Sequence, residues 1–95
     1  MNLAMKSLST IEQIDKALSL ANALATKEPD DRALQSIIKQ LEYLKGIWEA
    51  KGSLAAVPKG KMTLGVIAAK EEYDTNYPEL ANLLHDISWT VNQEK

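Results

Sequence analysis

Apolar residues recur along this chain at steps of three and four, the spacing that places side chains on one face of a helix. The first such run predicts a helix over residues 10–27, with its apolar face formed by Ile11, Ile14, Leu18, Ala21 and Ala25. Ser9 and Glu12 fit a capping box at its start, in which each side chain bonds the other residue's amide. Pro29 marks the end of this helix.

A second helix is predicted over residues 31–51, because Asp31 suits the capping position that satisfies free amides and complements the helix dipole. Its apolar face consists of Leu34, Ile37, Ile38, Leu41, Leu44 and Trp48. Lys45 falls within that face, so we expect its ammonium group to extend to the edge or to pair there. Gly52 occupies the place of a left-handed C-terminal cap.

Two more helices are predicted over residues 63–73 and 78–91. Thr63 is a plausible cap for the first of them, although Gly65 lowers its helix propensity by about 1 kcal/mol relative to alanine. Pro78 suits the first position of the last helix. The apolar face of that helix contains Leu80, Leu83, Leu84, Ile87 and Val91. Because no window of strand length alternates apolar and polar residues, the fold class is predicted to be all-α.

The connections between these helices are short, which favours antiparallel neighbours and predicts a small antiparallel four-helix bundle. At 95 residues, the chain is expected to form a single helical domain. Residues 1–8 are interpreted as an N-terminal arm and residues 92–95 as a C-terminal tail. Residues 52–62 contain two glycines and a proline and form the longest predicted loop.

Composition and charge exclude several classes of function. The net charge is −2 and no basic run is present, which argues against nucleic acid as a partner. No apolar run is long enough to span a membrane, and the N-terminus lacks a signal-peptide pattern, so a cytoplasmic protein is expected. Cysteine is absent and His85 is the one histidine, so we expect no disulfide, no metal site and no cofactor.

Enzymatic interpretations receive little support from the residues. Glu71 and Glu72 are sequence neighbours that point about 100° apart on a helix, so they do not imply a shared acid–base site. His85 and Ser88 lie one helical turn apart without an accompanying oxyanion motif. We therefore expect a protein that is not an enzyme.

Two aromatic residues do not fit a simple inward-facing pattern. Trp89 falls opposite the apolar face of the last helix, which indicates either a partner-binding anchor or a helix covered on both sides. Tyr43 forms a second apolar strip with Ile47 and Ala50, for which structural and interfacial roles are equally plausible. The predicted helix over 63–73 is apolar on both faces, so it is either central or part of an interface.

Residues 71–79 contain four acids and no lysine or arginine, whereas the whole chain carries only −2. This acidity is either a solvated surface or a rim that attracts a basic cleft, such as one that binds nucleotide phosphates. The candidate partner-binding residues are Glu71, Glu72, Tyr73, Asp74 and Tyr77, with Trp89 or Tyr43 as an aromatic anchor.

Three stretches, residues 11–20, 39–44 and 62–71, occur in an order that resembles a known family. The most specific block is Thr63-Leu64-Gly65-Val66-Ile67-Ala68-Ala69-Lys70-Glu71, followed by Asp74 and by Pro78-Glu79-Leu80. The chain resembles the small helical immunity proteins of bacterial type VI secretion that neutralise an effector with NAD(P)+ glycohydrolase activity.

The resemblance implies a cytoplasmic antitoxin without catalysis of its own, which binds a cognate toxin and occludes its active site. The toxin would be an NAD(P)+ glycohydrolase or a related NAD-consuming enzyme. From another class of function, the exposed aromatic residues also suit a self-associating helical adaptor that forms a homodimer.

Overall fold

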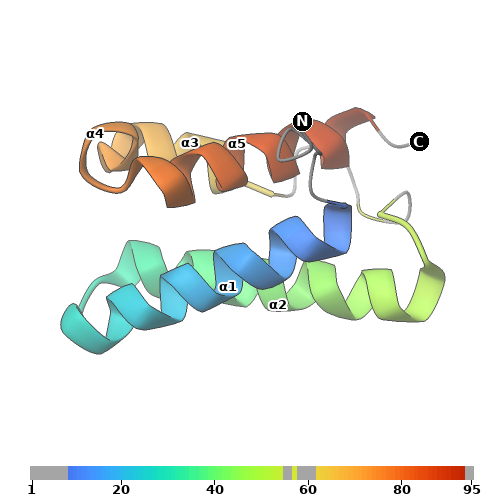
Figure 1. Cartoon of the computed structure of the whole chain (residues 1–95), viewed down its shortest axis with the longest axis horizontal. Coiled ribbons are helices and arrows are strands. Elements are labelled where there is room, and N and C mark those ends of the chain that lie inside the picture. Colours follow the sequence, from blue (N-terminus) through green and yellow to red (C-terminus); the bar gives the residue numbers. More distant parts are fainter. Residues whose placement is uncertain (1–8, 55–56, 58–61, 94–95) are drawn as a thin grey trace, which may run out of the picture.

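The computed structural model describes residues 9–54, 57 and 62–93, and every regular element in this part of the chain is a helix. The elements are α1 (Thr10–Lys27), α2 (Arg32–Lys51), α3 (Leu64–Lys70), α4 (Tyr73–Asn76) and α5 (Pro78–Gln93). Figure 1 shows two layers, with α1 beside α2 in one and α3, α4 and α5 in the other. The predicted all-α class is confirmed.

The predicted four-helix bundle is not confirmed, because the described residues form five helices. The helix expected over 63–73 ends at Lys70, and the single turn α4 follows it. The last helix extends to Gln93, two residues beyond the predicted end. The predicted arm 1–8, most of the predicted loop 52–62 and the last two residues of the predicted tail lie outside the described residues.

Local capping interactions fix the ends of the two long helices. The capping box of α1 is present, with the Glu12 amide donating to Ser9 Oγ at 3.3 Å and the Ser9 amide donating to Glu12 Oε1 at 2.8 Å. Asp31 caps α2, because its Oδ1 accepts from the Leu34 amide at 3.1 Å. Gly52 ends α2 at φ 74°, where a residue without Cβ avoids steric strain.

The hydrophobic core lies between the two layers and draws on every described helix. Its fully buried large side chains are Ile14, Leu34, Ile37, Leu41, Leu44, Leu54, Leu64, Leu80, Leu84, Ile87 and Val91. Burying each such side chain stabilises the fold by about 1.5–3 kcal/mol relative to leaving it exposed. No polar or charged residue of the described chain is buried, so apolar packing dominates the interior.

Close approach of α3 to α5 depends on Gly65. Its amide donates to Ser88 Oγ at 3.0 Å. A Cβ at this position would lie 3.3 Å from Nδ1 of His85 and 3.4 Å from Ser88 Oγ, which is tighter than most contacts of this kind. The glycine that weakens helix propensity in the sequence therefore lets two helices pack closely.

Polar contacts also connect the helices to one another. Thr63, predicted as a helix cap, makes no side-chain cap hydrogen bond; its amide instead donates to Gln40 Oε1 at 2.9 Å. The expected pairing of Lys45 is confirmed, since its Nζ lies 2.9 Å from Asp15 Oδ1. The hydrogen bond to Asp15 raises the pKa of Lys45. These contacts join α3 to α2 and α2 to α1.

Candidate functional site

An acidic turn separates α3 from α4 at one end of the molecule. Glu72 adopts a left-handed conformation with φ 61° and ψ 30°, which ends α3 and redirects the chain. Glu71, Glu72 and Asp74 are all exposed, whereas the intervening Tyr73 is buried. The turn therefore presents carboxylates to solvent while its aromatic ring enters the core.

Tyr73 joins this turn to the connection between α1 and α2. Its hydroxyl donates to Asp31 Oδ2 at 3.3 Å, across 42 residues of sequence. Burial raises the pKa of Tyr73, and the Asp31 carboxylate raises it further, because both disfavour a phenolate. Its ring also packs edge-on against Tyr77, with 5.4 Å between centroids. Consequently the α1–α2 connection and the α3–α4 turn lie at the same end of the molecule (Figure 1).

A second contact attaches α4 to α5. Nε2 of His85 lies 3.0 Å from Asp74 Oδ1, and both side chains are about half exposed. His85 therefore contributes to the position of the acidic turn. It does not pair with Ser88, whose hydroxyl accepts the Gly65 amide instead.

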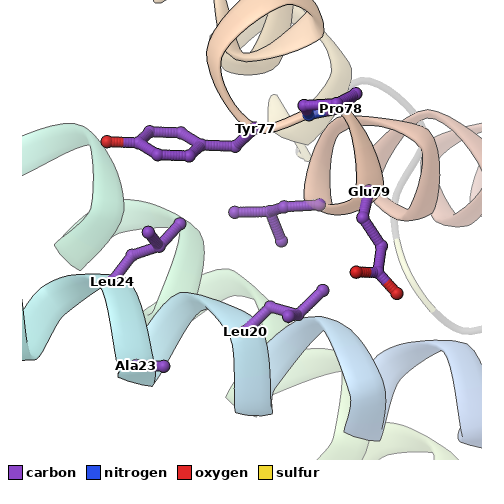
Figure 2. Close-up of a pocket in the computed structure, with 7 residues that line it drawn as sticks. Leu20, Ala23, Leu24, Tyr77, Pro78 and Glu79 are labelled. Atoms are coloured by element: carbon purple, nitrogen blue, oxygen red, sulfur yellow. The ribbon is translucent and has the colours of Figure 1, made fainter.

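An open apolar groove of about 370 Å³ lies between α1 and the junction of α4 with α5. It is lined by Leu20, Ala23, Leu24, Tyr77, Pro78, Glu79 and Leu80. Figure 2 shows the Tyr77 ring across the groove from Leu24, and the Glu79 side chain on the side nearer Leu20. Glu79 Oε2 lies 3.0 Å from Lys16 Nζ, an ion pair that links the two walls of the groove.

The structure places six of the seven sequence-predicted binding residues at three separate positions on the surface. Glu71, Glu72, Asp74 and Tyr77 lie together at the acidic end. Trp89 is 66% exposed, as its helical position predicted, but it lies eleven residues into α5, about 16 Å along the helix axis.

Tyr43 is 38% exposed and lies eleven residues into α2, at a similar distance from the acidic end. Tyr73, the seventh candidate, does not lie on the surface of the free chain. Only 3% of Tyr73 is exposed, because the left-handed Glu72 turns its ring into the core. Tyr73 therefore positions the acidic end from inside.

Sequence reasoning missed the α1 wall of the groove. This wall is formed by Leu20, Ala23 and Leu24. These residues form a second apolar strip beside the main apolar face of α1, and that strip is the feature of the sequence that could have predicted the wall. On α3, Leu64 and Ala68 are buried, whereas Val66 is 65% exposed. Val66 and Trp89 are therefore exposed apolar side chains on two neighbouring helices, α3 and α5.

Residues 9–54, 57 and 62–93 contain no group of three or more histidines and carboxylates arranged to hold a metal ion. Within the same residues, none of the helices has the length and apolar content needed to cross a membrane.

The family model Tsi6 matches residues 9–93, which cover both layers of the fold. The chain belongs to the Tsi6 family. A curated relative named "Immune protein Tsi6", from Pseudomonas aeruginosa, is 37% identical over 79 residues, which are 83% of this chain and 82% of the relative. No solved structure matches.

Membership in the Tsi6 family confirms the resemblance to type VI secretion immunity proteins seen in the sequence. The region that matches the Tsi6 model includes the acidic turn, the groove and Trp89. All the candidate binding residues therefore belong to the part of the chain shared with the family.

Proposed function

We propose that this chain is an immunity protein of type VI secretion that binds a cognate toxin and occludes its active site. Membership in the Tsi6 family carries this proposal, together with the name "immune protein" borne by the Pseudomonas relative. The proposed toxin is an NAD(P)+ glycohydrolase or a related NAD-consuming enzyme, on the resemblance of residues 63–71 and 78–80. The proposed compartment is the cytoplasm, and no catalytic activity is proposed for the chain itself.

Such a role requires a substantial contact surface. A specific interface of ordinary size buries about 800 Å² on each partner and uses about 20–30 residues. For a chain of 95 residues this is about a quarter of the molecule. The acidic end and the groove beside it offer a surface of the kind that this demands.

The test is whether the purified chain inhibits the NAD+ turnover of a partner enzyme. A tagged copy is used to recover partners from its native bacterium, and each partner is separated in denaturant, refolded alone and assayed for NAD+ consumption. Adding the chain back should abolish the activity with an equivalence point near one chain per toxin. The proposal fails if every recovered partner is indifferent to the added chain, or if the chain recovers only itself.

A self-associating adaptor is the second candidate, favoured by the exposure of Val66 and Trp89 on the neighbouring helices α3 and α5. Sedimentation velocity over a wide concentration range distinguishes the two functions. If the chain is an immunity protein, it should not form a tight dimer in the absence of the toxin. A tight dimer that Trp89→Ser dissociates, without any inhibited toxin, would favour the adaptor.

A further inference from the structure

The groove between α1 and the α4–α5 junction has apolar walls and lies beside the acidic end of the molecule, and these two properties restrict what can enter it. Resting on the proposed function, we propose that the groove binds an apolar side chain of the toxin that is flanked by lysine or arginine. The toxin would thereby be held by the acidic end of the immunity protein.

The walls of the groove favour an apolar occupant. Leu20, Leu24 and Tyr77 are only partly buried, and Leu80 forms part of the lining beneath them. Covering this surface removes apolar area from water, which is favourable at about 25 cal/mol per Å². The volume of about 370 Å³ lies at the small end of ligand pockets, so it suits a side chain or two rather than a folded segment.

The negative charge at this end of the molecule favours lysine or arginine next to that apolar side chain. Residues 27–32 and 70–74, the two turns at this end, contain six acids and three bases, a net charge of −3. The rest of the chain is therefore net +1, since the whole carries −2. The hydrogen bond from Tyr73 to Asp31 joins the two turns, so their fields add. A basic partner is attracted to this end and is oriented by it before contact.

The same charges disfavour a second copy of this chain as the occupant. A two-fold dimer uses the same patch on both subunits, so it would bring two acidic ends together. Like charges opposed across an interface cost free energy. The observations therefore favour a basic partner over self-association through this groove.

Three identical substitutions at exposed helical alanines test the groove. Ala23→Arg inserts a long cation into the groove, Ala69→Arg alters the face of α3 near Val66, and Ala50→Arg alters the far end of α2. All three keep a good helix former, and thermal unfolding monitored by circular dichroism confirms that each variant folds. Affinity is measured by titration calorimetry against the toxin identified by its inhibited NAD+ turnover.

We expect Ala23→Arg to weaken toxin binding at least 30-fold, the effect of losing a hot spot, and the other two variants to change it less than about 3-fold. Near-native affinity of folded Ala23→Arg, or a larger loss for Ala69→Arg, would overturn the groove while leaving the immunity function intact. If no NAD-consuming enzyme is inhibited by the unaltered chain, the proposed function itself fails.

A measurement that needs no toxin tests the chemistry of the occupant separately. Short amide-capped peptides, Lys-Lys-Leu-Lys-Lys and the matched Glu-Glu-Leu-Glu-Glu, are titrated into the labelled protein and followed by nitrogen–proton correlation spectra. The basic peptide should shift the amide signals of Ala23, Leu24 and Tyr77 at millimolar concentration, and the shifts should weaken with salt. Equal responses to both peptides, or shifts confined to residues near Trp89, would overturn the proposal.

Discussion

Replacing Glu72 by glycine should stabilise the fold. Among the described residues Glu72 is the only one other than glycine with a positive φ, at 61°. The left-handed conformation costs a residue with a Cβ about 1–2 kcal/mol. Glycine removes this strain, but it also gives the unfolded chain more conformational entropy, which lowers the unfolding free energy by about 0.4–1 kcal/mol. The expected net gain in unfolding free energy is about 0.5–1 kcal/mol, or about 2–8 °C in Tm for a domain of this size.

Urea denaturation at pH 7 followed by circular dichroism measures this gain, and two variants isolate its cause. Glu72→Ala removes the carboxylate but retains a Cβ, so it separates charge from backbone strain. Glu71→Gly places glycine at φ −89°, where no left-handed strain is relieved, and should lower stability by up to about 1 kcal/mol. The reasoning is refuted if Glu72→Gly is no more stable than Glu72→Ala.

Two further predictions concern the contact between the turns. Asp31→Ala should lower the unfolding free energy measured by calorimetry by about 1–3 kcal/mol, because it removes both the α2 cap and the acceptor of the Tyr73 hydroxyl. Asp31→Asn keeps a capping oxygen and should lower the unfolding free energy less. Equal losses in the two variants would contradict this assignment. Because the pKa of Tyr73 is raised on folding, its contribution to stability is complete below about pH 10 and declines as the pH rises above that value. Absorbance at 295 nm should show one late-ionising tyrosine that Tyr73→Phe removes, and persistence of the late step in that variant would refute it.

The sequence by itself determined where α1 and α2 begin and end and where α5 begins. The capping box at Ser9, the cap at Asp31, the left-handed Gly52 and the start at Pro78 all depend on interactions within a few residues. Such local preferences are visible in the order of residues, as is the outward position of Trp89 on its helix. The family resemblance likewise followed from residues in order.

The break at Glu72 could not be predicted in this way. Residues 63–73 have a helical pattern, and glutamate is a good helix former that rarely adopts positive φ. Burial of Tyr73 against Tyr77 and its hydrogen bond to Asp31 accompany the left-handed turn and offset its local cost. Helix propensity describes residues 63–73 as an isolated segment, and in the folded chain tertiary packing overrides that propensity.

The tertiary structure alone brought the two acidic turns together and formed the groove beside them. Tyr73 and Asp31 are 42 residues apart, and the groove takes its walls from α1 and from the α4–α5 junction. Sequence periodicity fixes which face of a helix is apolar, but it does not fix which helices become neighbours. Packing of the two layers around one core decided that, and with it the position of an apolar groove at the acidic end of the molecule.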